Sequence, residues 1–154
     1  MKRHAQEIEN LINNLKEHGQ AGLNPSESQL RDLLSEDRDG PLQFVNLLGF
    51  HDTARYPDGH ELATQKLSGE KAYANYGAVA LKHVMKRGGT LVCLNTVEQT
   101  IIGPGHAWHQ VAIMQYPNTA AFIDMLLDPE YSAALIHRDA GLRQTEVLVT
   151  RPLL

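Results

Sequence analysis

The chain has 154 residues, of which 42% are apolar and 21% charged, an ordinary composition for one globular domain. Its net charge of −4 and pI near 6.0 provide no basic surface, so nucleic acid and anionic membranes are excluded as expected partners. No stretch approaches the roughly 18 apolar residues of a membrane span, and the N-terminus lacks the apolar segment of a signal peptide. The single cysteine, Cys93, is expected to be buried and inert. Because it cannot form an internal disulfide, it fits a reducing compartment, and a cytoplasmic location is predicted.

Residues 1–40 are predicted to form an N-terminal helical extension that holds most of the excess negative charge. Helical spacing places four of its apolar residues in one narrow stripe: Ile8, Leu11, Ile12 and Leu15. This first helix is expected to end near Gly19 or Gly22. A second, short helix is predicted to start at Asn24-Pro25-Ser26-Glu27, with Asn24 as its N-cap. Both helices are expected to pack on the body of the protein or on a partner subunit.

Residues 41–154 are predicted to form one domain in which strands and helices alternate. Strands are expected over residues 43–50, 90–97, 107–116 and 145–150, with one helix over 69–87 and another capped by Asn118. The order βαββαβ predicts an α+β, ferredoxin-like fold with an antiparallel sheet and both helices on one face.

The expected sheet is apolar on both faces. In strand 43–50, Phe44 and Leu48 point to one face and Val45 and Leu47 point to the other. In strand 107–116, the same alternation assigns two sets of apolar residues to opposite faces. Those sets are Trp108, Ala112 and Met114 on one face, and Val111 and Ile113 on the other. Because a solvated face would be polar, we expect the second face to be covered, most simply by a homodimer that packs sheet to sheet.

Several separated motifs in this domain resemble the longer members of the DUF1330 family, over roughly residues 42–152. The motifs are residues 44–50, 54–59 and 68–77, then Trp108, Tyr116-Pro117, Phe122, Asp128-Pro129-Glu130-Tyr131 and Arg138. The resemblance implies the dimeric α/β-barrel superfamily, whose facing sheets enclose a cavity and which includes small monooxygenases, isomerases and ligand-binding proteins. It implies no established activity. The chain departs from the family pattern at His109, where an acidic residue commonly follows the tryptophan.

Candidate site residues can be selected on the predicted strands and helices. Asn46 and Asn95 are strand amides that need hydrogen-bond partners or a ligand. Trp108 could stack on a ligand or anchor the dimer interface. Tyr73 and Tyr76 lie at i and i+3 of one helix and either belong to the core or reach a cavity.

Charged and titratable candidates lie at the strand ends and loops. His51 and His109 could approach one another in the sheet, as a general-base pair or a weak metal site. Arg138 could bind an anionic ligand or could pair with an acid to hold its helix. Arg55 lies in the loop 51–67, whose length of about 17 residues favours a functional loop such as a lid.

The other motifs predict no metal or cofactor. The eight histidines lack the spacing of metal ligands, and the turn at Gly103-Pro104-Gly105 lacks the features of a phosphate loop. Two functions fit these residues. The first is a cofactor-independent enzyme or ligand binder, with Asn46, Trp108 and His109 lining an apolar cavity. The second is a non-catalytic dimeric interaction module that engages a partner through its N-terminal helices. The sequence does not decide whether the protein is an enzyme and names no substrate.

Overall fold

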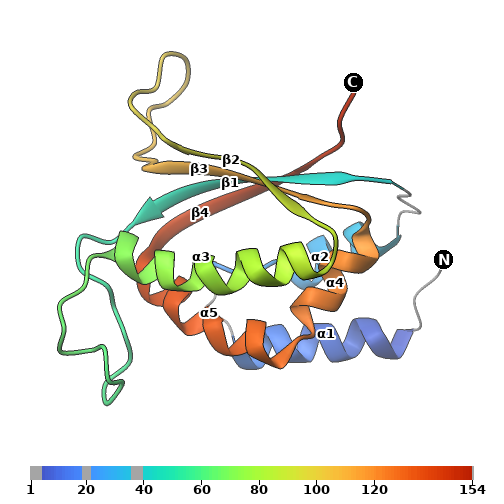
Figure 1. The fold of residues 1–154 in the computed structure, drawn as a ribbon, viewed down its shortest axis with the longest axis horizontal. Coiled ribbons are helices and arrows are strands. Elements are labelled where there is room, and N and C mark those ends of the chain that lie inside the picture. Colours follow the sequence, from blue (N-terminus) through green and yellow to red (C-terminus); the bar gives the residue numbers. More distant parts are fainter. Residues whose placement is uncertain (1–4, 19–21, 36–39, 154) are drawn as a thin grey trace.

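The computed structural model describes residues 5–18, 22–35 and 40–153 of the chain (Figure 1). In order, the elements are α1 (Ala5–His18), α2 (Glu27–Ser35), β1 (Leu42–Phe50), α3 (Gly69–Lys86), β2 (Thr90–Thr96), β3 (Gln110–Tyr116), α4 (Thr119–Leu126), α5 (Pro129–Gly141) and β4 (Leu142–Thr150). Among the described residues, no helix combines the length and the apolar character that crossing a membrane requires.

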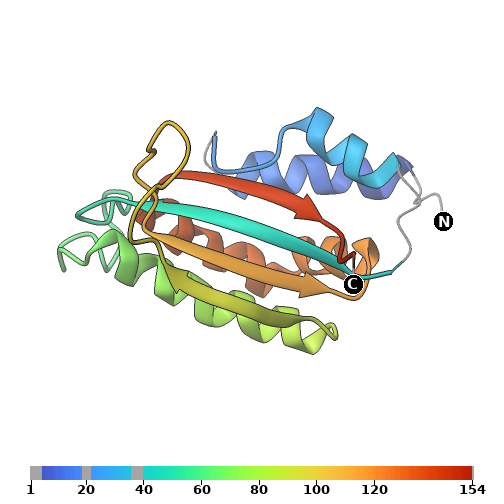
Figure 2. The same cartoon turned by 90° about the horizontal axis from the view of Figure 1, so that it is seen from above.

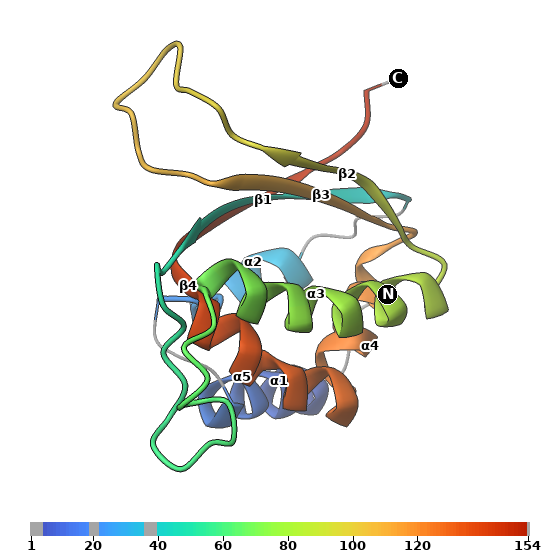
Figure 3. The same cartoon turned by 60° about the vertical axis from the view of Figure 1, so that its left-hand side comes forward.

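The four strands form one antiparallel sheet in the order β2-β3-β1-β4 (Figure 2). All helices lie on one side of this sheet, with α3 and α5 directly against each other (Figures 1 and 3). This is the arrangement of a split βαββαβ unit, with α1 and α2 added. The predicted α+β, ferredoxin-like fold is confirmed.

The two faces of the sheet differ in how well they are covered. Phe44 and Leu48 of β1 point toward the helices and are buried, as predicted. Residues on the opposite side stay partly exposed, and we call this side the open face. It contains Val45, which lies between Ile113 of β3 and Leu148 of β4, and its neighbours Leu47, Val111 and Cys93.

The two N-terminal helices pack on the body of the chain. Leu11 and Leu15 of α1 and Leu30 of α2 are buried in the same apolar cluster as Leu135 of α5. The α1 helix is described as far as His18, so the predicted stop at Gly19 lies outside the described residues. The apolar stripe of the extension therefore contributes to the main core.

The N-cap of α2 is Ser26, so the assignment of the cap to Asn24 is wrong. Ser26 Oγ accepts a hydrogen bond from Gln29 N at 3.2 Å, and Gln29 Oε1 accepts one from Ser26 N at 2.9 Å. This reciprocal pair satisfies two backbone donors together, so a cap at Ser26 is more stable than one at Asn24. Asn24 Nδ2 instead donates to the Leu15 carbonyl at 3.4 Å.

Strand β2 contains an irregularity that strict alternation does not anticipate. Leu91 pairs with Met114, whereas Cys93 pairs with the adjacent Ile113, so Val92 is an extra residue in the ladder. The bulge changes the side on which the following residues point. Leu91 and Cys93 therefore lie on opposite faces, and Cys93 is half-buried on the open face, so the prediction of a buried thiol is wrong.

The helical segment after Asn118 is two helices rather than one. Asn118 caps α4 as predicted, with its side chain accepting from Ala121 N at 2.9 Å. The chain then turns, and Asp128 caps α5 by accepting from Glu130 N at 3.0 Å. Pro129 follows this cap at the start of α5, where a missing N–H costs nothing.

Two glycines let the start of α3 and the end of α5 approach closely. A Cβ at Gly69 would collide with the backbone of His51 and Gly141, and a Cβ at Gly141 would collide with Gly69 and Tyr73. The close approach allows His51 N to donate to Gly141 O at 2.9 Å and Gly69 N to donate to His51 O at 3.0 Å. It therefore fixes the backbone of His51 where β1 ends.

Candidate functional site

The loop after β1 is fastened to α5 along its length. Arg55 N donates to Ala140 O at 2.8 Å, and Ala54 N donates to Leu67 O at 2.8 Å. The buried Tyr56 hydroxyl lies 2.8 Å from His137 Nδ1, and its ring stacks on His60 with centroids 4.7 Å apart. Side chains at the beginning of this loop are thus held against the body of the protein.

A pocket of about 490 Å³ opens where this loop leaves the sheet. Its lining residues are Phe50, His51, Asp52, Thr53, Ala54, Arg55 and Arg143. Arg143 comes from the start of β4, so the pocket joins two distant segments. With two guanidinium groups and one carboxylate, the pocket carries an excess of positive charge that an anion could neutralise.

The electrostatics of this pocket favour an uncharged His51. Burial lowers the pKa of His51, and the nearby positive charges of Arg55 and Arg143 lower it further, whereas Asp52 opposes them. Among the described residues, no carboxylate forms an ion pair with Arg55 or Arg143. An imidazole that is neutral near pH 7 can accept a proton, and the arginines beside it can hold an anionic group.

A second hollow of about 470 Å³ adjoins the first because Arg55 lines both. It lies between the loop and α5, and its other lining residues are Pro57, Ser132, Ala133, Ile136, Asp139 and Ala140. Most of these contribute apolar surface. The two hollows together offer a charged end and an apolar end on either side of one arginine.

Trp108 and His109 precede β3 at the same end of the sheet as His51. His109 Nδ1 accepts a hydrogen bond from Phe50 N at 2.9 Å, and the His109 ring stacks on Phe50 with centroids 5.7 Å apart. Neutral His109 therefore carries its hydrogen on Nε2. His51 and His109 flank Phe50, but within the described part of the chain no hydrogen bond joins the two imidazoles. Trp108 is half-buried, with its ring against that of His106.

Tyr73, Tyr76 and Arg138 lie together in the layer of α3 and α5, behind the pocket, where the Tyr73 ring lies 5.4 Å from that of Phe50. The Tyr73 and Tyr76 rings are 5.3 Å apart, and the hydroxyls of Tyr76 and Tyr131 are 2.8 Å apart. Burial raises the pKa of Tyr73 well above its usual range. Arg138 pairs with Asp139 at 2.9 Å and donates to Asn24, so an acid and an amide already engage its guanidinium.

The two asparagines have different surroundings. Asn46 faces the helices, and its Nδ2 donates to the carbonyls of Phe44 at 3.0 Å and Ala112 at 3.1 Å. Asn95 is exposed on the open face, opposite Val111 of β3. Of the predicted residues, the structure thus gathers His51 and Arg55 in one pocket. His109 and Tyr73 both pack on Phe50 beside it, and Trp108 adjoins His109.

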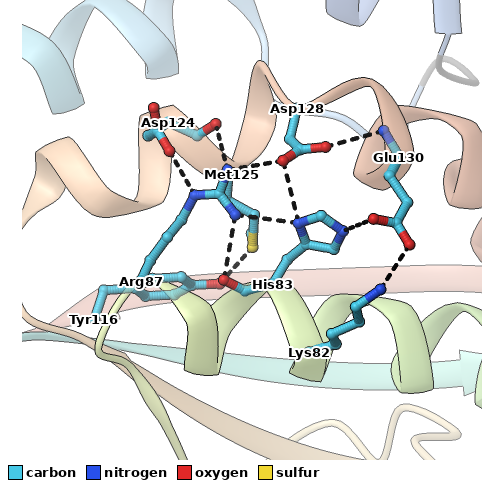
Figure 4. Close-up of polar contacts among 8 residues, drawn as sticks. All are labelled: Lys82, His83, Arg87, Tyr116, Asp124, Met125, Asp128 and Glu130. Carbon is cyan, nitrogen blue, oxygen red and sulfur yellow. Dashed lines mark hydrogen bonds and ion pairs between the residues drawn. The ribbon is translucent and has the colours of Figure 1, made fainter.

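A third polar cluster, which the sequence interpretation missed, joins the last turn of α3 to the start of α5 (Figure 4). His83, Asp128 and Glu130 each place a ligand-type atom within 4.8 Å of the others. Arg87 binds Asp124 Oδ2 at 2.6 Å and Asp128 Oδ2 at 3.0 Å. The sequence pattern that could have indicated this cluster is the N-cap at Asp128-Pro129, because a capping carboxylate at the start of one helix can also contact the end of a neighbouring helix.

The fold and the pocket define a small ferredoxin-like protein with a positively charged recess at one end of its sheet. The chain belongs to the DUF1330 family, since the family described as "Domain of unknown function (DUF1330)" matches residues 59–151. The predicted membership is confirmed.

The chain is also similar to solved structures. The methylated RPA0582 protein is 33% identical, with a TM-score of 0.77 over 86% of this chain and 95% of that chain. A second structure of RPA0582, a protein of unknown function from Rhodopseudomonas palustris, is 31% identical, with a TM-score of 0.77 over 88% and 99% of the two chains. SnoaB, a cofactor-independent oxygenase from Streptomyces nogalater, is 13% identical, with a TM-score of 0.47 over 75% and 95%. None of the curated proteins matches the sequence.

Proposed function

We propose that this DUF1330 protein binds a small molecule that has an anionic group and an apolar tail. The observation that carries the proposal is the pair of adjoining hollows on either side of Arg55. The anionic group would lie between Arg55 and Arg143, and the tail would lie along Ile136 and Ala133. In this proposal, His51 accepts a proton from the bound molecule, and His109 is a donor through Nε2 at the same end of the sheet.

Straight-chain carboxylates from acetate to octanoate test this proposal. Each added methylene that enters the apolar hollow contributes about 0.8 kcal/mol, so affinity should rise about fourfold per carbon until the hollow is full. Calorimetric titration of the full chain measures the series. Replacing Arg55 or Arg143 by Gln should abolish binding, whereas R31Q, on the exposed surface of α2, should leave it unchanged. Affinities that do not depend on chain length or on Arg55 would contradict the proposal.

We also propose that the protein acts as a homodimer in the cytoplasm, formed by packing two open faces together. The open face exposes Leu148 together with the neighbouring partly exposed Val45 and Ile113. On the same side of the sheet, the β2–β3 loop projects outward and carries the almost fully exposed Ile101 and Ile102 (Figures 1 and 3). A second copy would cover this apolar surface.

Two neighbouring residues on β4 provide a matched test of this dimer. Leu148 and Val147 are 47% and 45% exposed, but they lie on opposite sides of the sheet, with Leu148 on the open face. We expect L148E to give a monomer and V147E to leave the dimer intact, as measured by native mass spectrometry. A monomeric wild-type chain at micromolar concentration, or equal effects of both substitutions, would refute the sheet-to-sheet arrangement.

The interaction module has less support than ligand binding. The apolar stripe that would engage a partner is already buried, since Leu11, Leu15 and Leu30 pack on the body of the chain. Of the described part of the extension, the charged outer surface of α1 and α2 is left for such a partner.

A further inference from the structure

His83 offers a nitrogen atom that the fold buries without giving it a hydrogen bond. The side chain is 1% exposed, and within the described part of the chain its Nε2 has no hydrogen-bond partner. Glu130 Oε2 lies 3.2 Å from this nitrogen, at ion-pair distance but outside hydrogen-bond geometry. Figure 4 shows the imidazole edge directed at the Glu130 carboxylate. A buried polar atom without a well-formed hydrogen bond is unusual in proteins and calls for an explanation, of which a bound ion is one.

Neighbouring lysine and arginine side chains contact the second polar atom of Glu130 and of His83. Lys82 Nζ binds Glu130 Oε1 at 2.9 Å, and Arg87 Nη1 lies 3.1 Å from His83 Nδ1. His83 Nε2 and Glu130 Oε2 are therefore the pair of atoms that remain facing each other. Glu130 is 57% exposed, so an ion could reach this pair from solvent along the carboxylate.

We propose that His83 Nε2 and Glu130 Oε2 bind a divalent transition-metal ion of the Zn²⁺ type. Zinc binds imidazole nitrogen and carboxylate oxygen at about 2.0–2.2 Å, and at a tetrahedral angle these bonds separate the two ligand atoms by about 3.3–3.6 Å. The observed Nε2–Oε2 separation of 3.2 Å lies close to this range, so a small movement of the exposed Glu130 carboxylate suffices. Imidazole with carboxylate is also a ligand set that suits this class of ion.

Asp128 supplies the outer contact that a metal-binding histidine usually has. Its Oδ2 lies 3.4 Å from His83 Nδ1, the arrangement in which a carboxylate holds the ring so that Nε2 faces the metal. Without the ion, Arg87 donates to Nδ1 and the hydrogen belongs on Nε2. Binding of the ion removes that hydrogen. Nδ1 then carries one and donates it to Asp128 Oδ2, and the Arg87 donor must move off Nδ1.

The alternative is that the cluster acts only as an ionic clamp between α3 and α5. Lys82 then stabilises Glu130, and an added cation would merely compete with it. The two interpretations differ in whether Zn²⁺ engages His83 Nε2, which the tautomer of the ring reports. Lys82 is 66% exposed and can be changed without disturbing the core. Loss of a competing exposed ammonium should improve metal affinity by up to about fivefold, because surface ion pairs contribute up to about 1 kcal/mol.

Calorimetric titration of the chelator-treated full chain with ZnCl₂ tests the proposal. We expect one Zn²⁺ per chain, affinity reduced at least tenfold in E130Q and increased in K82Q, and no change in H106Q, which alters an exposed histidine in the β2–β3 loop. In ¹⁵N NMR spectra, the His83 ring should shift from an Nε2–H to an Nδ1–H form when Zn²⁺ binds, a change that a purely structural role would not produce.

Three results would overturn the metal site. They are no Zn²⁺ binding up to millimolar concentration, equal affinities of wild type and E130Q, and an unchanged His83 ring spectrum at saturation. Because Glu130 and Lys82 lie on the surface, both variants should fold, and circular dichroism checks this before titration.

Discussion

Positively charged side chains lie at both ends of the antiparallel α3–α5 pair, but their charges are neutralised to different extents. At the Gly69 and Gly141 end, Arg55 and Arg143 share a pocket with a single carboxylate, Asp52. At the other end, carboxylates of α4 and of the start of α5 bind Arg87, and Glu130 binds Lys82. Positive charge is in excess at the first end and already matched at the second. A ligand anion is therefore expected only at the first end.

The backbone differs at the two ends as well. Where Gly69 meets Gly141, the helices touch through their main chains, and that contact sets His51 in place. At the opposite end, side chains span the gap, with Arg87 reaching across to Asp124 and Asp128. Main-chain packing thus holds the helices together at one end, and ion pairs hold them together at the other. Each kind of contact can be removed separately by mutation.

The largest expected effect comes from adding one methyl group at the glycine crossing. In G141A, the new Cβ would collide with Gly69 and Tyr73 backbone atoms, so we expect a loss of about 3 kcal/mol in unfolding free energy. Gly77 is the matched control, because it is in the same α3 helix layer with open space around it. There G77A should stabilise by about 0.5–1 kcal/mol. Urea denaturation measures both, and equal effects would show that the crossing is not tight.

Removing the ion pairs of Arg87 should have the next largest effect. In R87M, Asp128 loses its guanidinium partner, and we expect a loss of about 2 kcal/mol at neutral pH, as for hydrogen bonds to charged groups. The exposed Arg31 pairs with Glu9 and Glu27 on the surface, so R31M should cost less than about 1 kcal/mol.

The effect of R87M should depend on pH in a defined direction. The hydrogen bond from Arg87 lowers the pKa of Asp128 in the folded chain. The resulting stability is present above the ordinary aspartate pKa and is lost as pH falls through the lowered one. Wild type and R87M should therefore converge in stability in acid, as urea titrations at several pH values would show. A difference that persists unchanged in acid would contradict the role of Asp128.

The sequence predicted the fold well because the relevant signals are local. The alternation around Phe44, the glycines after α3 and the cap at Asn118 each depend on a few neighbouring residues. The bulge at Val92 could not be predicted, because it depends on how β2 pairs with β3. Cys93 was assigned to the core for the same reason.

Candidate residues were predicted individually, but their grouping was not. His51 and Arg55 are close in sequence, whereas Arg143 joins them only because β4 pairs with β1. Likewise, His83 meets Glu130 only because α3 and α5 run antiparallel. The identity of such partners depends on the tertiary structure, which periodicity and spacing do not specify.

The smallest and sharpest test concerns the charge balance around His51. Burial and the positive charges of Arg55 and Arg143 lower its pKa, and Asp52 raises it. We therefore expect R143Q to raise the pKa of His51 and D52N to lower it further, as followed by NMR titration of the imidazole signals. R31Q, which lies on α2, should change neither.

Opposite shifts in the two variants would establish that Arg143 and Asp52 both act on His51. With Arg55 also present, two cations then face one carboxylate in this pocket, unlike the matched charges at the other end of the helices. A folded-state pKa below the unfolded one means that charging His51 in acid costs stability, and this cost appears as pH falls through the ordinary histidine pKa. R143Q should reduce this loss. No shift in either R143Q or D52N would instead mean that burial alone sets the pKa of His51, and the case for an anion held by Arg55 and Arg143 would then fail with it.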